Sequence, residues 1–430
     1  MRYLWILSFA LVNIPVQAQH TLYGLLDRYA DDIEDEVIEW RRNIHANPEL
    51  SNREFRTAAL VAEHLRSLGM DVRTEVAHTG VIGFLRGAGD GPVVALRADM
   101  DALPVTELTD VPFASKVRST YLGQEVGVMH ACGHDTHVAM LMGVATVLSQ
   151  VRDQLPGSVK FIFQPAEEGA PEGEEGGAEL MLKEGAFLNP APEVIFGLHV
   201  WPERVGRLSY RAGSFMASVD ELYIKVRGRQ THGAVPWGGV DPIVVASQIV
   251  LGLQTIASRQ LPATATPSII TVGIIRGGVR NNIIPDEVEM RGTIRTFLPA
   301  VRTDIEQRVR RTAESIAAAS GATAEVRIIN GYPVTVNDVA LTEAMLPTLH
   351  RVAGEGQVKQ ADRITGAEDF SYFANEVSGL FLFLGITPAD QDPATAAPNH
   401  SPYFYVDESA LKVGVRTLSN LAIDYMLANQ

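Results

Sequence analysis

Residues 93–101 read VVALRADMD, a short apolar run that leads directly into an arginine and two aspartates. The pattern recurs at 159–168 (VKFIFQPAEE) and at 194–199 (VIFGLH). Runs this apolar suit strands that are covered on both faces, and the helical pattern over 138–148 could supply part of the cover. Ligands of open α/β sheets bind outside the carboxyl ends of the strands, so we expect these polar residues to face one crevice.

A second pattern occupies residues 215–330. Its periodicity predicts the order β-α-β-β-α-β of a ferredoxin-like module, with strands at 219–226, 268–275, 288–296 and 324–329 and helices at 242–258 and 301–319. Apolar strands of the first kind resume at residue 380. We therefore predict an α/β protein: a mainly parallel, mixed-sheet domain in two parts (19–214 and 331–430) with the ferredoxin-like βαββαβ module inserted between them.

The composition excludes several classes of protein. Hydrophobic residues make up 46% and charged residues 20% of the 430 residues, an ordinary globular mixture that excludes general disorder. Lys and Arg number 36 against 51 Asp and Glu, giving a formal net charge of −15. This charge repels a phosphate backbone and no basic patch offsets it, so nucleic acid is not an expected partner.

The first eighteen residues are typical of a secretory signal. Arg2 is followed by a mostly apolar run over 4–15, and small residues at Val16 and Ala18 form a cleavage site before Gln19. A buried or interfacial N-terminal helix is the alternative interpretation. No later run reaches about 18 apolar residues, so no membrane association is expected after signal removal. The single cysteine excludes an intramolecular disulfide. An exported protein without disulfides fits a bacterial periplasm, so the predicted location is periplasmic or secreted.

Residues 130–137 (HACGHDTH) are the densest group of potential metal ligands. Thiolate and imidazole are the usual ligands of zinc and similar ions, and Cys132 and His134 can point the same way from an extended loop. Buried, inert side chains are the alternative. Adjacent Glu167 and Glu168 point in opposite directions on an extended backbone, so one can bind a metal while the other acts as general base. A solvated acidic loop is their simpler interpretation.

A competing mechanism makes Cys132 a nucleophile activated by His134 or His137. It leaves four suitable residues without a role: Glu167, Glu168, His199 and His400. The candidate ligands are residue types suited to a divalent ion and are spread over several strand ends, which favours a metal site.

Seven short motifs lie along the chain: RADMDALP (97–104), MHACGHD (129–135), QPAEEG (164–169), GLH (197–199), THGAVP (231–236), GAEDF (366–370) and NHSP (399–402). Together they resemble the dinuclear-metal amidohydrolases of the aminoacylase and carboxypeptidase superfamily. The branch is that of hippurate hydrolase, auxin-conjugate hydrolases and N-acyl-amino-acid deacylases, and the resemblance covers about residues 35 to 425.

The resemblance implies a metallopeptidase domain with an inserted lid that mediates dimerisation, and two divalent metal ions, with zinc, manganese, cobalt and nickel all open. The implied ligands are Cys132, His134, Glu168, His199 and His400, with Cys132 bridging the two ions. Glu167 is the implied general base. Distant relatives carry His-x-Asp where this chain has Arg97-Ala98-Asp99, so Asp99 is expected to orient rather than to bind.

The expected reaction is hydrolysis of a small-molecule N-acyl amino acid to a carboxylic acid and a free amino acid. Asn282 and Arg291 are candidates to bind the substrate carboxylate. His232 is a loop histidine by its local sequence, but the resemblance implies that it crosses a homodimer to stabilise the oxyanion in the partner's site. A metal-dependent exopeptidase or dipeptidase is the alternative enzyme, and a catalytically silent binding protein of the same fold is the alternative from another class.

Overall fold

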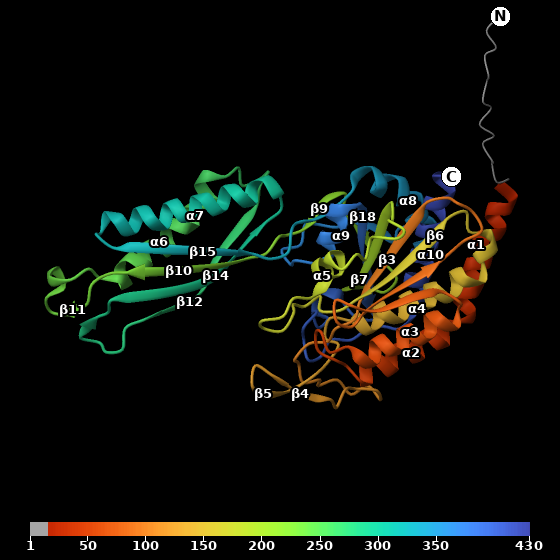
Figure 1. The fold of residues 1–430 in the computed structure, drawn as a ribbon, viewed down its shortest axis with the longest axis horizontal. Coiled ribbons are helices and arrows are strands. Elements are labelled where there is room, and N and C mark those ends of the chain that lie inside the picture. The colour runs from red at the N-terminus through yellow and green to blue at the C-terminus, as the bar shows by residue number, and fades with distance from the viewer. Residues whose placement is uncertain (1–15) are drawn as a thin grey trace, which may run out of the picture.

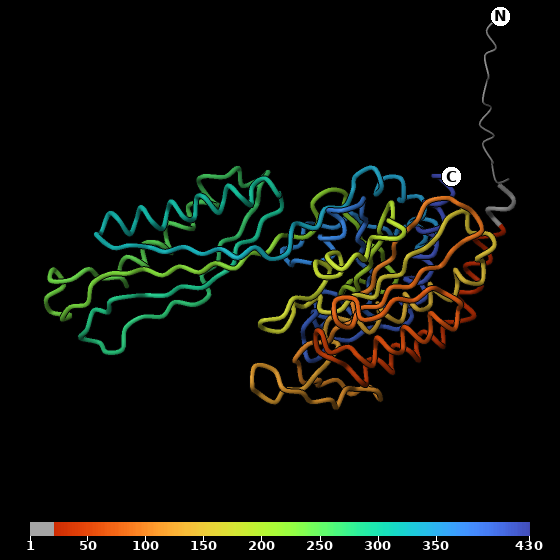
Figure 2. The backbone as a smooth tube through the Cα atoms, viewed as in Figure 1, coloured from red at the N-terminus to blue at the C-terminus, as the bar shows by residue number. Residues whose placement is uncertain are grey.

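The computed structural model describes residues 16–430, and Figures 1 and 2 show a main domain from which an elongated module projects. The predicted signal peptide therefore lies outside the described residues, except that its last three residues begin α1 (Val16–Asp32). Within the described part of the chain, no helix combines the length and apolar character needed to cross a membrane.

The main domain is built on an eight-stranded mixed sheet. Its central strands β6, β3, β7 and β18 are mutually parallel, whereas β1 and β2 add to one side in antiparallel fashion. The mainly parallel, mixed sheet predicted from the sequence is therefore confirmed. In spatial order the strands are β1 (Asp71–Val76), β2 (Gly80–Leu85), β6 (Ser158–Gln164), β3 (Val93–Asp99), β7 (Val194–Arg204), β18 (Ser378–Thr387), β8 (Leu208–Tyr210) and β17 (Val358–Gln360).

Both faces of this sheet are buried, as the uniformly apolar strands require. Along β18, Leu382 belongs to the core cluster on one face, whereas its neighbours Phe381 and Phe383 belong to the cluster on the other. Each such side chain contributes about 1.5–3 kcal/mol on burial. The first cluster includes α1, α2 (Glu34–Ala46), α3 (Phe55–Ser67), α4 (His134–Gln150), α8 (Val339–Ala353) and α10 (Ser409–Ala428), and the second includes α5 (Gly177–Lys183) and α9 (Phe370–Glu376).

The inserted module, called the lid below, has its own four-stranded antiparallel sheet in the order β12-β14-β10-β15, the order of a ferredoxin-like fold. Helix α6 begins where the sequence provides a cap: the Asp241 carboxylate accepts hydrogen bonds from two backbone N–H groups, and Pro242 occupies the first position. The lid elements are β10 (Asp220–Arg227), β11 (Thr231–His232), α6 (Pro242–Thr255), β12 (Ser268–Gly277), β13 (Ile283–Ile284), β14 (Glu287–Thr296), α7 (Pro299–Ala319) and β15 (Thr323–Asn330).

One face of the lid sheet packs against α6 and α7. Leu222 and Ile224 of β10 share a buried cluster with Ile249 of α6 and Val309 of α7. The lid therefore has a hydrophobic core separate from those of the main domain, which explains why it can project as an independent body in Figure 1.

Two linkers, 217–219 and 331–334, join the lid to the main domain and are called the strap below. The N–H of Val219 donates to the carbonyl of Tyr332 (3.0 Å), and the N–H of Gly331 donates to the carbonyl of Val219 (3.0 Å). The strap continues into paired strands of the main domain, β9 (Gly213–Met216) and β16 (Thr335–Asn337), and a separate hairpin is formed by β4 (Arg118–Tyr121) and β5 (Gln124–Gly127).

Candidate metal centre and active site

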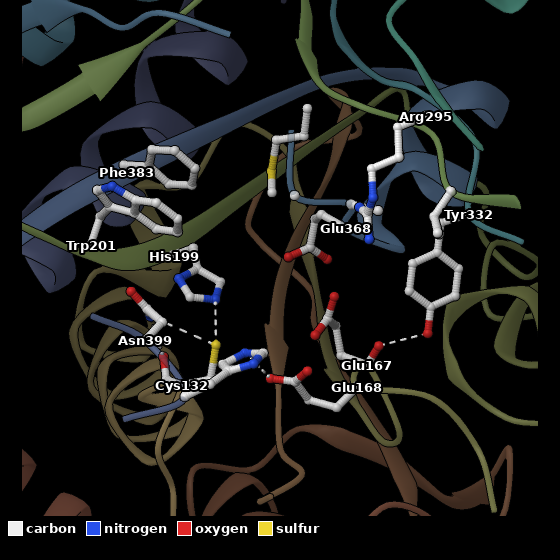
Figure 3. Close-up of a pocket in the computed structure, with 15 residues that line it drawn as sticks. Cys132, Glu167, Glu168, His199, Trp201, Arg295, Tyr332, Glu368, Phe383 and Asn399 are labelled. Atoms are coloured by element: carbon white, nitrogen blue, oxygen red, sulfur yellow. Dashed lines mark hydrogen bonds and ion pairs between the residues drawn. The ribbon is translucent and has the colours of Figure 1, made fainter. Parts of the chain in front are cut away.

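The polar clusters that follow β3 and β6 meet those of β7 and α4 at one edge of the main sheet. β3 ends at Asp99 and β6 at Gln164, and these residues are direct partners in the parallel ladder. A cavity of about 400 Å³ opens at this edge, and Figure 3 shows Cys132, Glu167, Glu168 and His199 around it. The crevice predicted from the strand ends is therefore present.

The local backbone places Cys132 and His134 on either side of a glycine. Gly133 has a left-handed conformation (φ +89°), and a Cβ atom there would lie 2.4 Å from Val200 Cγ2, so both its conformation and its space favour glycine. Cys132 Sγ lies 3.4 Å from His199 Nε2, while His199 Nδ1 lies 2.7 Å from its neighbour's carbonyl oxygen. The Nε2 atom of His199 therefore faces the thiol.

Two groups of potential ligands share Cys132. In one, the ligand atoms of Cys132, His134 and His199 lie within 4.8 Å of one another. In the other, those of Cys132, Glu168 and His400 meet the same limit. A thiolate common to two ligand groups has the position required of a bridge between two ions, so the arrangement is compatible with the predicted ligand set.

The chemistry of these residues fits divalent cations. His134 is fully buried, and its Nε2 atom has no hydrogen-bond partner among the described residues. Burial, together with repulsion from Glu368 and Glu168, holds the pKa of Glu167 well above its usual range. Burial and the same kind of repulsion raise the pKa of the Cys132 thiol. A dication among these groups would reverse both effects, because it favours the ionised forms.

Glu167 and Glu168 take different directions from one loop. Glu168 Oε1 lies 3.0 Å from His400 Nε2, on the side of the second ligand group. Glu167 Oε2 lies 3.9 Å from His134 Nε2, and its side chain lines the cavity (Figure 3). His400 itself has a left-handed conformation (φ +71°), which is costly for a residue other than glycine and is typical of functional sites.

Asp99 lies next to two histidines. Its Oδ1 atom lies 2.5 Å from His137 Nδ1 and 3.8 Å from His134 Nδ1. The other nitrogen of His137, Nε2, accepts a hydrogen bond from the backbone N–H of Val200 (2.9 Å), the residue after His199. Asp99 and His137 therefore hold the backbone beside His199. The sequence singled out His137 only as a possible activator of Cys132.

Arg97, which the sequence placed in the polar cluster after the first apolar run, is buried among carboxylates that the sequence did not predict as its partners. Its guanidinium donates to Asp99 (2.6 Å), Glu368 (2.9 Å) and Asp369 (3.0 Å). Burial alone would lower the pKa of Arg97, but the surrounding carboxylates raise it above its usual value. The arginine at the end of an apolar strand could have predicted this cluster, because a buried guanidinium requires acidic partners.

The cavity has an aromatic wall opposite its carboxylates. Trp201 stacks on Phe383, with ring centroids 4.7 Å apart and an angle of 11° between the planes. Met216, at the end of β9, also lines the cavity. Arg295 of β14 reaches the cavity from the lid (Figure 3). None of these four residues was among those predicted.

Three predicted residues lie elsewhere in this arrangement. His232 and Asn282 are exposed on neighbouring segments near β11 and β13, at the end of the lid furthest from the main domain (Figure 1). Arg291 lies on the open face of the lid sheet, with its guanidinium 5.3 Å from the ring centroid of Tyr223. Arg295 is four residues further along β14, about 13 Å closer to the strap, and it is this arginine that lines the cavity.

Comparisons with known proteins agree with this site. Residues 95–424 match the model of peptidase family M20/M25/M40. The chain is 42% identical over 399 residues to thermostable carboxypeptidase 2 of Saccharolobus solfataricus, covering 92% of this chain and 96% of that protein. It is 38% identical over 380 residues to the N-acetyl-L-cysteine deacetylase of Bacillus subtilis, covering 88% and 85%. A solved structure, the Bacillus subtilis YXEP protein, described as a dinuclear metal binding peptidase from the M20 family, is 35% identical with a TM-score of 0.77, covering 92% of this chain and 99% of that one.

Proposed function

The chain belongs to peptidase family M20/M25/M40 and is a metal-dependent amide hydrolase with two divalent ions, and from this premise we propose that it cleaves N-acyl amino acids. The observation that carries the proposal is the cavity, which is lined by Glu167, by an aromatic wall, by Arg295 and by four of the candidate ligands: Cys132, Glu168, His199 and His400. A similar chain of Bacillus subtilis is an N-acetyl-L-cysteine deacetylase, which supports this substrate class.

The proposed ligands are Cys132, His134, Glu168, His199 and His400. When bound, the two ions lower the pKa of a water molecule and polarise the scissile carbonyl. Their identity among zinc, manganese, cobalt and nickel is open.

Glu167 supplies the proton transfers of the proposed reaction. Its carboxylate accepts the proton of the attacking water and then returns it to the nitrogen of the leaving amino acid. The atoms balance, because the hydroxyl goes to the acyl carbon and the two protons of the new amine come from the amide and the water. Asp99 acts through His137 and the backbone beside His199, and so orients this ligand without binding.

Substrate orientation follows from the two sides of the cavity. Arg295 is the cation placed to receive the α-carboxylate, because its side chain lines the cavity and a guanidinium binds a carboxylate in a bidentate manner. The stacked rings of Trp201 and Phe383 offer an apolar surface to the acyl group. Asn282 and Arg291 lie away from the cavity of their own chain, so they can bind the substrate α-carboxylate only in the cavity of another copy of the chain.

We propose that such a copy is present and that the enzyme is a homodimer. β12 is an edge strand of the lid sheet, and Ile274 (41% exposed) and Ile275 (51% exposed) lie on it. On α6, Leu251 is 71% exposed. An apolar edge strand beside an apolar helix face is a favourable surface for pairing with a second copy.

His232 supports the dimer because it lies far from its own metal centre. Its Nδ1 atom accepts a hydrogen bond from the N–H of Ala234 (3.0 Å), which places the ring proton on Nε2. An N–H of this kind can stabilise a developing oxyanion. We propose that His232 does so in the partner's site.

Export is proposed from the sequence alone. The basic Arg2, the apolar run over 4–15 and the small residues before Gln19 support a cleaved signal and a periplasmic or secreted enzyme. The N-terminal sequence of the protein recovered from its native host tests this proposal: it should begin at Gln19.

A substrate panel tests the proposed reaction. The purified protein, loaded separately with each of the four metals, is assayed on N-acetyl, N-benzoyl and indole-acetyl amino acids and on dipeptides. We expect kcat/KM to be highest for an N-acyl amino acid. Preference for dipeptides would favour the exopeptidase alternative, and no turnover with fully bound metal would favour a silent binding protein.

A further inference from the structure

Tyr332 connects the strap to the active site. Its backbone carbonyl accepts the hydrogen bond from Val219 that joins the two halves of the strap. Its side chain leaves the strap and lines the cavity beside Glu167 (Figure 3). Tyr332 therefore belongs both to the connection that carries the lid and to the wall of the site.

The phenol of Tyr332 holds the backbone of the proposed base. Tyr332 Oη donates a hydrogen bond to the carbonyl oxygen of Glu167 at 2.7 Å. The hydroxyl is the donor in this contact, because a carbonyl oxygen can only accept a hydrogen bond. The contact is made to the main chain, which leaves the carboxylate of Glu167 available in the cavity.

The same peptide unit is held on its other side by the main domain. The N–H of Glu168 donates to Asp101 Oδ2 (3.0 Å), and the N–H of Glu167 donates to Asp101 Oδ1 (3.0 Å). The peptide between Glu167 and Glu168 is thus held at its N–H by Asp101 and at its C=O by Tyr332. Displacement of this peptide would move both carboxylates, because the Cα atoms at its two ends carry the Glu167 and Glu168 side chains.

This loop depends on such contacts for its conformation. Ala166 has a left-handed backbone (φ +52°), which is unfavourable for alanine. Its N–H donates to Glu54 Oε1 (2.9 Å), which fixes the loop before Glu167. Glu54 precedes α3 of the main domain, whereas the contact after Glu167 comes from Tyr332 on the strap.

We propose that Tyr332 is a positioning residue for the catalytic base: its hydroxyl fixes the Glu167–Glu168 peptide and makes the direction of the Glu167 carboxylate depend on the position of the strap. The proposal rests on the assignment of Glu167 as the base in the proposed function. It assigns no contact with substrate to Tyr332, so its effect falls on turnover and not on substrate binding.

The test compares Tyr332→Phe with Tyr372→Phe, each in the full-length enzyme with both metals bound. Tyr372 is a matched control, because its hydroxyl donates to Gly331 on the same strap (3.4 Å) and its ring lies 6.2 Å from that of Tyr332, but it does not bond to Glu167. For the best N-acyl amino acid of the panel, Tyr332→Phe should lower kcat about tenfold, as expected for one lost hydrogen bond. KM should stay within about twofold, and bound metal and the melting temperature should match those of Tyr372→Phe.

An unchanged kcat in Tyr332→Phe would overturn the proposal, and a raised KM alongside it would indicate a substrate contact. An equal loss of kcat in Tyr372→Phe would also overturn it, because it would indicate general support of the strap. Glu167→Gln is measured in parallel. If Glu167→Gln is inactive while Tyr332→Phe is fully active, the positioning role alone is wrong. If Glu167→Gln is active, the base assignment and the positioning role are both wrong.

Discussion

Cys132 Sγ lies 3.4 Å from His199 Nε2, and the same sulfur belongs to a second group of ligand atoms with Glu168 and His400. These residues come from the loop before α4, from β7, from the loop after β6 and from the segment before α10. One sulfur atom therefore connects four parts of the chain.

We expect Cys132→Ala to lose bound metal, because both ligand groups lose their common member. Cys132→Ser is the matched variant, since it keeps a small polar side chain without a thiolate ligand. Metal analysis after dialysis should show at most one ion per chain in either variant. Two tightly bound ions with full activity would show that the thiol is only packed against His199.

Glu167→Gln and Glu168→Gln should differ although the residues are adjacent. Glu167→Gln should fold and bind two ions but lose about 10² to 10⁴ in kcat, the usual cost of removing a general base. Glu168→Gln should bind metal less tightly, because its carboxylate lies 3.0 Å from His400 and within the second ligand group. Metal titrations with kcat measured at saturation separate the two effects, and equal phenotypes would contradict the division of roles.

Arg97→Met should destabilise the main domain strongly. It removes the guanidinium from three buried carboxylates, those of Asp99, Glu368 and Asp369. Breaking a buried ion pair from one side typically costs about 3–5 kcal/mol. Urea unfolding of metal-free protein measures the loss, with Arg53→Met as control because Arg53 pairs with Glu174 near the surface. A loss below about 1 kcal/mol for Arg97→Met would contradict the role of Arg97 as the shared partner of these carboxylates.

His45 should make the stability of the protein depend on pH. Burial lowers its pKa, but Asp135 (2.8 Å) and Glu107 (3.1 Å) outweigh burial and raise the pKa above the ordinary value. Since the folded pKa exceeds the unfolded one, the contribution is complete below about pH 6.5 and is lost as the pH rises through the folded pKa. The difference in the free energy of unfolding between the wild type and His45→Gln should therefore shrink above pH 6.5. A difference in the free energy of unfolding that grows with pH would contradict the raised pKa of His45 in the folded protein.

Local patterns were sufficient to predict the parts of the fold and site that depend on neighbouring residues. The apolar runs at 93–96 and 194–198 predicted a sheet covered on both faces, and the alternation at 219–226 predicted the first strand of the lid. The spacing of Cys132 and His134 and the adjacency of Glu167 and Glu168 indicated a metal site. These features depend on strand alternation and loop direction, which short stretches of sequence determine.

The missed residues depend on contacts between distant parts of the chain. Arg97 and Glu368 are separated by 271 positions, and no local pattern pairs them. Arg291 and Arg295 lie on the same strand and differ mainly in their distance from the strap, which is a property of the three-dimensional arrangement. Tyr332 is inconspicuous in sequence because its importance lies in a bond to the backbone of Glu167.

The last prediction is that His232 of one subunit serves Glu167 of the other. His232 lies at the end of the lid furthest from its own metal centre (Figure 1). Trp237 (80% exposed) follows it on the same segment, and Val279 (96% exposed) lies on the segment leading to β13, the strand that pairs with β11. An exposed histidine among apolar side chains suits insertion into a partner's cavity. His232→Ala and Glu167→Gln should each be nearly inactive, the first because loss of an oxyanion donor costs about 10² to 10³ in kcat.

Mixing the two inactive variants should then restore activity. After dissociation and reassociation, a heterodimer has one site with both defects and one site with neither, so a statistical mixture should recover about a quarter of the wild-type activity. Sedimentation or native mass spectrometry establishes that heterodimers form, and a mixture of His232→Ala with wild type controls for the exchange itself. Inactive heterodimers would show that His232 acts within its own chain or has no role, since only a donor supplied by the partner can be separated from the base in this way.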